Sequence, residues 1–183
     1  MVLLKWWKGL KKTKQVNRQI MMSSTQTRRK FKPIELLKPI NSVEIKANEL
    51  FSFIELAIKY ATREIIGVGI GIYDSENKSA KITSIYAVLD APGNKSRVML
   101  DVATHQRLDE TLNFWRNGEE IAVLHSHPGF GCLSSAIDEA HGIRMAALLF
   151  GGIAVMIIVD PLHIEGIKIA AFSLDPANKA VRK

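Results

Sequence analysis

Two histidines and an aspartate of this 183-residue chain have a spacing that suits a metal ion. His125 and His127 are separated by one residue, and Asp138 follows after ten more, in the pattern His-x-His-x10-Asp. Zinc accepts imidazole nitrogens and carboxylate oxygens, and three protein ligands leave its fourth tetrahedral position open for water. An open site activates water, whereas a closed one only stabilises a fold. The pattern therefore predicts a catalytic zinc site and a hydrolase.

The residues before the two histidines predict a buried strand over 120–127. Because side chains alternate along a strand, His125 and His127 are expected to share one face, and Ser126 to point to the other. The stretch Pro128–Gly131 then breaks the strand and predicts a loop.

A helix is expected to follow this loop, over residues 135–149. Either Ser134 or Ser135 suits its N-cap. Asp138 then falls in the first helical turn, where the helix dipole favours a negative charge. Strand end, loop and helix start can thus converge on one cation.

The stretch from His125 to Asp138 resembles the signature of the JAMM (MPN+) metalloproteases, which is a Glu upstream and then His-[Ser/Thr]-His-Pro-x6-Ser-x-x-Asp. The chain fits this pattern without a gap, with Ser135 at the serine position and a Gly-Phe-Gly-Cys filling similar to the proteasome-lid and signalosome isopeptidases. Residues 63–67, Arg-Glu-Ile-Ile-Gly, resemble the upstream motif, and residues 154–161, which end in Val-Asp-Pro, resemble a later strand of the family. The likeness covers about residues 33 to 175.

This resemblance implies an α/β fold: an MPN (JAMM) domain with a mixed, curved β-sheet flanked by helices, in a three-layer architecture like that of cytidine deaminases. His125, His127 and Asp138 would ligate Zn²⁺. Glu64 would be the general base, and Ser135 would hydrogen-bond the oxyanion. The implied activity is a zinc-dependent isopeptidase or peptidase that hydrolyses the bond after the C-terminal Gly-Gly of ubiquitin-like or sulfur-carrier modifier proteins.

The resemblance also implies partners and a compartment. The partners would be ubiquitin-like modifiers and their lysine-linked conjugates, with proteasome association as a further option and no nucleic acid. The chain is similar in length to the minimal archaeal and bacterial members. Two alternatives remain open, a processing peptidase that trims a sulfur-carrier protein and a non-catalytic MPN scaffold. Such scaffolds usually lack some of the ligands, whereas all are present here.

Other chemistries fit the sequence less well. Cys132 is the only cysteine, which excludes an internal disulfide and favours a cytoplasmic location. It could serve a thiol hydrolase, but two histidines at metal spacing suit that role poorly, and the family resemblance places it near the metal without ligating it. Zinc deaminases need His-x-Glu and Cys-x-x-Cys, and neither occurs. We expect His105, His141 and His163 to be ordinary surface or cap residues.

Two further features permit more than one interpretation. Glu64 lies at the end of an expected helix, so it could also be a solvated charge. Gly67, Gly69 and Gly71 alternate along the next expected strand and suggest a phosphate loop, but Gly-x-Gly-x-x-Gly is incomplete and no helix follows. Close backbone packing, or access for an extended substrate, is the better interpretation.

Length and 47% apolar content predict one compact domain over residues 35–183. Interspersed helices and strands predict a mixed sheet with helices on its faces. The expected elements are helices over 48–62, 104–117 and 135–149, and strands over 64–73, 80–90, 97–102, 120–127, 153–159 and 165–173. Residues 74–78 predict a turn that joins the first two of these strands as a hairpin.

The charge is unevenly distributed along the chain. Residues 1–34 contain ten Lys or Arg and no acid, whereas residues 35–183 contain 15 basic and 18 acidic residues. Leu3, Trp6, Trp7 and Leu10 recur at helical spacing among lysines, a pattern compatible with contact to an anionic membrane or to nucleic acid. A flexible basic tail, or a start at the later Met21-Met22 pair, explains the same pattern.

Overall fold

The computed structural model describes residues 40–74, 76–112, 119–148, 154–176 and 178–183. The expected basic segment 1–34 lies outside these residues, as do residues 113–117 of the expected second helix. None of the helices in the described part of the chain has the length and apolar character needed to cross a bilayer. The elements, in chain order, are β1 (Ser42–Ile45), α1 (Ala47–Lys59), β2 (Ile66–Asp74), β3 (Ser79–Val88), β4 (Gly93–Asn94), β5 (Arg97–Val98), α2 (Val102–Leu112), β6 (Glu119–Ser126), α4 (Ala136–Leu148), β7 (Ala154–Asp160), β8 (Lys168–Asp175) and β9 (Ala180–Arg182).

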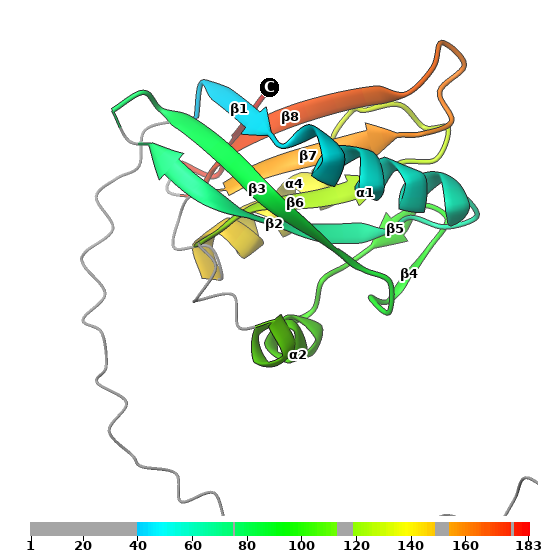
Figure 1. Cartoon of the computed structure of the whole chain (residues 1–183), viewed down its shortest axis with the longest axis horizontal. Helices are drawn as coiled ribbons and strands as arrows, with labels where there is room; N and C mark the ends of the chain where they lie inside the picture. The colour runs from blue at the N-terminus through cyan, green and yellow to red at the C-terminus, as the bar shows by residue number, and fades with distance from the viewer. Residues whose placement is uncertain (1–39, 75, 113–118, 149–153, 177) are drawn as a thin grey trace, which may run out of the picture. The chain divides into compact units, whose positions relative to one another are not determined.

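Seven of the strands form one mixed sheet in the order β1-β3-β2-β6-β7-β8-β9 (Figure 1). The β1/β3 and β6/β7 pairs are parallel, and the other pairs are antiparallel. The parallel β6/β7 pair requires a crossover, which α4 supplies. The expected mixed sheet and the β2–β3 hairpin are confirmed, and β6 occupies the centre of the sheet.

The sheet is curled. β1 and β8 lie near opposite ends of the strand order, yet the backbone N–H of Ile40, just before β1, donates to Ser173 Oγ of β8 at 3.0 Å. Right-handed twist accumulates across a sheet of this size and brings its ends toward each other. The expected curvature is therefore present.

Helices cover both faces of the sheet. On one face, α1 buries Phe53, Ile54 and Ala57 against the strands. On the other, α4 contributes Met145 and Ala146 to a second apolar cluster. Full burial of a side chain such as Phe53 stabilises the fold by roughly 1.5–3 kcal/mol. The helix–sheet–helix layering expected from the sequence holds for these elements.

The alternating glycines of β2 allow close packing. A Cβ atom on Gly67 would lie 2.8 Å from the ring of Phe53, and one on Gly69 would lie 2.8 Å from the Cβ of Ala122. A Cβ on Gly71 would overlap the backbone carbonyl of Lys81 in β3. These contacts support the packing interpretation of the glycines over a phosphate loop.

Several element boundaries were predicted wrongly. The strand expected over 97–102 is only Arg97–Val98, which pairs with Gly93–Asn94 in a small hairpin. The short strands β1 and β9, of four and three residues, were not expected, because segments this short give only a weak strand signal. β8 begins at Lys168 rather than 165, because Gly166 adopts φ +99° in the preceding turn. These errors lie at sheet edges and in turns, where local sequence carries the weakest signal.

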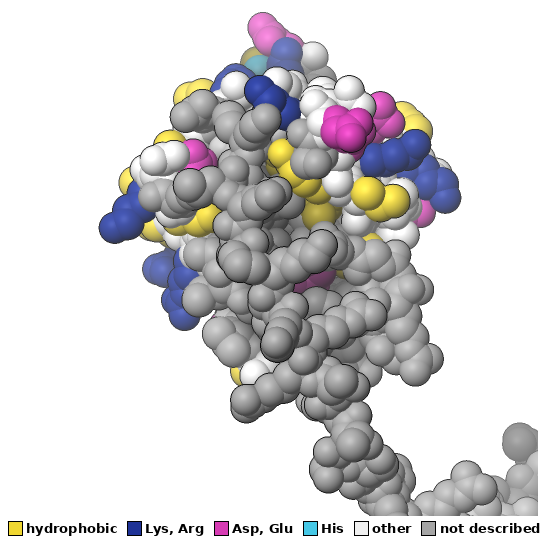
Figure 2. All heavy atoms as spheres, turned by 90° about the vertical axis from the view of Figure 1, so that its left-hand side faces the viewer, with side chains coloured by type: hydrophobic (Ala, Val, Ile, Leu, Met, Phe, Trp, Pro, Cys, Tyr) yellow, Lys and Arg dark blue, Asp and Glu magenta, His cyan; other side chains and the backbone are white. Residues whose placement is uncertain are grey.

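The described surface carries charges of both signs. Figure 2 shows Lys and Arg side chains next to Asp, Glu and apolar side chains over the described part of one face. This mixture agrees with the near balance of basic and acidic residues over 35–183.

Candidate metal centre

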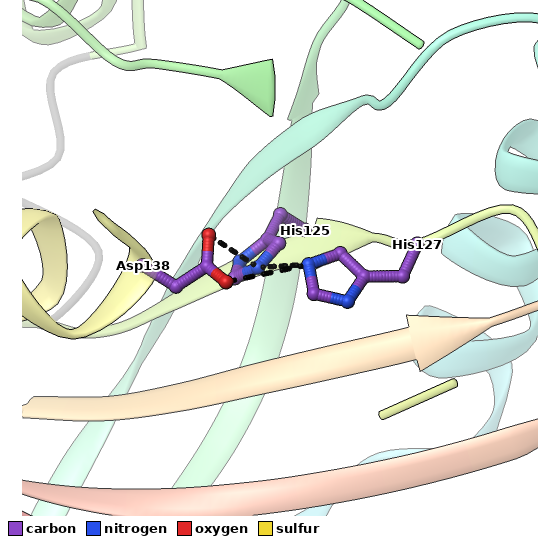
Figure 3. A group of neighbouring side chains, drawn as sticks. All are labelled: His125, His127 and Asp138. Carbon is purple, nitrogen blue, oxygen red and sulfur yellow. Dashed lines mark hydrogen bonds and ion pairs between the residues drawn. The ribbon is translucent and has the colours of Figure 1, made fainter. Parts of the chain in front are cut away.

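Three side chains converge at the C-terminal end of β6 (Figure 3). His125 Nε2 lies 3.0 Å from His127 Nε2, and Asp138 places one carboxylate oxygen 3.4 Å from the first nitrogen and the other 3.5 Å from the second. Around a tetrahedral zinc ion with bonds of about 2.0–2.1 Å, ligand atoms stand about 3.3 Å apart. The donor set and its spacing therefore fit a metal ion, and this largely buried group could hold one.

Strand geometry explains why both imidazoles meet the carboxylate. His125 lies within β6 and His127 directly follows its end, so both side chains point to the face that α4 covers. Ser126 points to the other face, as expected, where its Oγ accepts the N–H of Ile65 at 3.0 Å. The backbone N–H of His127 donates to Val159 of β7 at 2.8 Å, which holds the residue in line with the sheet.

A capping box at the start of α4 positions the side chain of Asp138. The backbone N–H of Asp138 donates to Ser135 Oγ at 3.2 Å, and the backbone N–H of Ser135 donates to Asp138 Oδ2 at 2.8 Å. Ser135 is therefore the N-cap of α4. Ser134, the alternative, instead bonds the carboxylate of Glu139 through its hydroxyl at 2.8 Å. The helix start thus fixes one metal donor by the hydrogen bonds that begin the helix.

The electrostatics of the group favour a cation. Burial raises the pKa of Asp138, but hydrogen bonds from His125 and His127 outweigh it and hold this pKa far below its usual range. Burial keeps the pKa of His125 below its ordinary value. Burial also opposes charge on His127, yet Asp138 and Glu64 raise its pKa above the ordinary value. Two carboxylates thus create a negative potential at the point that the imidazole nitrogens face.

Glu64 lies beside this group, two residues before β2. Its side chain is buried, with one oxygen 3.9 Å from His127 Nε2. Burial is the main cause that raises the pKa of Glu64 to about 7, and the Asp138 charge adds to it, while His127 and a hydrogen bond from the Val98 backbone oppose it. The interpretation of Glu64 as a solvated charge is therefore wrong.

The β2–β6 pairing brings Glu64 to the metal group. Ile66 pairs with His125 in the antiparallel register, and Ile65 and Ser126 exchange two hydrogen bonds at the junction. The backbone N–H of Glu64 donates to Asn94 in the β4–β5 hairpin at 2.9 Å. All five predicted site residues thus lie together: Glu64, His125, His127, Ser135 and Asp138.

Two residues near the site were not singled out from the sequence. Ser126 joins the Glu64 segment to β6, as described above. Asp160, at the end of β7, is fully buried and accepts hydrogen bonds from backbone N–H groups of the loop after β6. Burial raises its pKa, but these hydrogen bonds hold the pKa of Asp160 below its usual range. Its place in a Val-Asp-Pro sequence after an apolar strand was the available signal.

The remaining candidates lie outside the metal group. Cys132 packs against the α4-side core, and burial raises the pKa of its thiol, which disfavours a thiolate nucleophile. His105 was expected at the surface, but it is buried and lies 2.7 Å from the Glu120 carboxylate, so that expectation is wrong. His141 is half-buried on α4, with a ring nitrogen 3.4 Å from the Leu100 carbonyl. His163 accepts the N–H of Glu165 in a turn, as a cap residue does.

No protein-family model matches the chain, and no curated protein matches it. Among solved structures, the chain is similar to the protein DSY2949 from Desulfitobacterium hafniense, determined in solution, with a TM-score of 0.58. The two are 15% identical, and the match covers 76% of this chain and 87% of that one. At this identity, the likeness shows a shared α/β fold and nothing about activity.

Proposed function

We propose that this protein is a JAMM-type zinc metalloprotease with an MPN fold, which cleaves after the C-terminal Gly-Gly of ubiquitin-like or sulfur-carrier modifiers. The observation that carries the proposal is the buried Glu64 carboxylate beside a group of three metal donors. A structural zinc site has four protein ligands and needs no neighbouring base. A catalytic site needs both an open position and a base.

Zinc is the metal that the donor set favours, because two imidazoles and one carboxylate in tetrahedral spacing suit it. Bound there, Zn²⁺ would supply a Lewis acid that lowers the pKa of water toward about 7 and polarises a carbonyl. Every other part of the proposed mechanism belongs to side chains of the chain itself.

Glu64 is proposed to move the proton. A base works best when its pKa lies near the working pH, and burial places the pKa of Glu64 at about 7. Its carboxylate would accept a proton from the attacking water and deliver it to the nitrogen of the departing lysine or peptide amine. Because the same oxygen acts first as base and then as acid, no other proton carrier is required.

Ser135 is proposed to stabilise the oxyanion. Its Oγ acts as an acceptor toward the backbone of Asp138, which leaves the hydroxyl hydrogen available to donate. The capping box fixes this hydroxyl next to a metal donor before any substrate binds. Such a preorganised donor strengthens its hydrogen bond as negative charge develops on the carbonyl oxygen.

The substrate class rests on the fit of residues 125–138 and of Glu64 to the JAMM signature. Ubiquitin-like modifiers end in an extended, narrow Gly-Gly tail, and a lysine-linked conjugate adds a flexible branch at the scissile bond. The complete donor set argues against the scaffold alternative. Whether the amine comes from a lysine side chain or from a linear fusion is decided by experiment.

The test uses the full chain loaded with zinc, with branched ubiquitin-like–lysine conjugates and matched linear fusions as substrates. We expect cleavage that 1,10-phenanthroline stops and added zinc restores. Glu64→Gln should lower turnover by roughly 10²- to 10⁴-fold while zinc content stays at one per chain. Glu44→Gln is the matched control, because Glu44 lies on the edge strand β1 with an exposed side chain.

Three outcomes would contradict or narrow the proposal. Full activity of Glu64→Gln would refute the proposed role of Glu64. A wild-type chain that binds no zinc would refute the metal centre. Cleavage of linear fusions alone would identify a processing peptidase rather than an isopeptidase.

A further inference from the structure

The Asp160 carboxylate holds the loop that follows the two histidines. One of its oxygens accepts the backbone N–H of Gly129 at 2.8 Å and that of Leu162 at 3.0 Å, and the other accepts the N–H of Gly131 at 2.7 Å. Asp160 is 0% exposed. A buried carboxylate needs such donors, because desolvation of an unpaired charge costs several kcal/mol.

A peptide segment of this loop connects Asp160 to the metal group through hydrogen bonds. Gly131 donates its N–H to Asp160, and its carbonyl oxygen lies 3.1 Å from His127 Nδ1. A carbonyl can only accept, so Nδ1 carries a hydrogen, and the neutral ring that binds a metal then offers the lone pair of Nε2. Nε2 is the ring nitrogen that faces His125 and Asp138.

We propose that Asp160 is a positioning residue for the metal centre, which sets the tautomer and ring orientation of His127 through the Gly131 residue. The inference deepens the proposed function, on whose metal centre it rests, but it concerns metal binding rather than cleavage. Metal-binding histidines commonly depend on such outer partners, whose loss weakens metal binding by roughly 10- to 100-fold.

A carboxylate suits this position better than any neutral side chain. Gly129 and Gly131 both adopt a positive φ, +81° and +79°, so two residues of the loop have little conformational preference of their own. The two oxygens of Asp160 hold both glycine amides at once. An asparagine offers one oxygen, and its NH₂ group would face a donor.

The first test compares Asp160→Asn with Asp74→Asn. Asp74 also accepts two backbone N–H groups, those of Glu76 and Asn77, but it does so at the other end of β2 from the metal group. Zinc affinity is measured without substrate, by competition with a chromophoric chelator, and ligand geometry is followed in the absorption spectrum of the Co²⁺-loaded protein. We expect Asp160→Asn to bind zinc about 10- to 100-fold more weakly, with a changed spectrum. Asp74→Asn should change neither.

The pair Gly129→Ala and Gly131→Ala tests the positioning role if Asp160→Asn fails to fold. An added Cβ meets nothing within 4 Å at Gly129 or at Gly131, so alanine at either position strains a similar backbone conformation. Of these two glycines, Gly131 is the one whose carbonyl oxygen lies 3.1 Å from His127 Nδ1. Gly131→Ala should therefore weaken zinc binding several-fold more than Gly129→Ala.

The outcomes separate this inference from the proposed function. Wild-type zinc affinity and spectrum in folded Asp160→Asn, or equal effects of the two glycine variants, would overturn the positioning role. A wild-type chain that binds zinc but cleaves no modifier would refute the proposed activity and leave the positioning role standing.

Discussion

The two ends of the β2–β6 strand pair differ in what the sequence places there. At the metal end, Ile66 pairs with His125, and the buried Glu64 precedes it. At the other end, Gly71 pairs with Glu119, and β2 turns back into β3 through Asp74 (Figure 1). The metal end gathers the candidate site residues, whereas the other end brings backbones into close contact beside the buried His105 and Glu120.

The difference shows how one strand pair separates stability from chemistry. Burial of Glu64 raises its pKa, so this end of the pair carries an ionisation cost. The other end also buries ionisable side chains, those of His105 and Glu120, but it is distinguished by backbone packing that only glycine permits. Substitutions at the glycine end should therefore change stability alone, whereas those at the metal end should change activity and leave the fold intact.

The largest effect is expected from Gly71→Ala. The new Cβ would overlap the carbonyl of Lys81 and lie 2.9 Å from Ile121, at a place where the strand register already shifts. We expect a loss of roughly 3 kcal/mol or more in the free energy of unfolding, measured by urea denaturation. Zinc content and turnover per folded molecule should remain those of the wild type. A stable variant with impaired zinc binding would show that the two ends are coupled.

A smaller effect is expected from Ser135→Ala at the metal end. Loss of the hydroxyl should lower turnover by about 10²-fold and the free energy of unfolding by about 1 kcal/mol, because the oxyanion donor and the helix cap disappear together. Ser134→Ala is the control, since Ser134 contacts Glu139 instead of capping α4. Steady-state kinetics and thermal melts measure the two effects. Equal turnover in the two variants would remove Ser135 from the mechanism.

The sequence predicted the metal end better than the rest of the molecule. His125 and His127 follow an apolar run that predicts a buried strand, and local capping rules placed the helix start at Ser134 or Ser135, of which Ser135 caps α4. The position of Glu64 beside them depends on β2–β6 register across some sixty residues. Spacing alone carries no information about that register, and the family resemblance supplied it.

The parts that were missed depend on tertiary contacts. Asp160 accepts hydrogen bonds from a loop about thirty residues away, and its Val-Asp-Pro sequence marks a strand end without revealing those contacts. His105 is buried on α2, where its ring lies 2.7 Å from the carboxylate of Glu120 near the start of β6. β1 pairs in parallel with β3, and its four residues are too short a segment to predict as a strand without that partner.

The last predicted effect is the pH dependence of stability that Glu64 causes at the metal end. In the metal-free protein, the pKa of Glu64 is about 7 in the folded state and near the ordinary 4.5 in the unfolded chain. The folded state therefore binds more protons between these values, and its free energy of unfolding falls as pH rises from about 4.5 to about 7. Glu64→Gln removes this loss, because the amide does not ionise.

With a chelator present, we expect Glu64→Gln to match the wild type near pH 4.5 and to exceed it by about 1–3 kcal/mol at pH 8, measured by urea denaturation. Glu44→Gln, which alters an exposed side chain and keeps Glu64, should differ little from the wild type at both pH values. A variant less stable than the wild type at pH 8 would mean that His127 and the Val98 backbone stabilise the Glu64 carboxylate more than burial disfavours it. The pKa of Glu64 would then not lie near the working pH. The buried polar groups at the metal end would in that case contribute to folding stability rather than to catalysis.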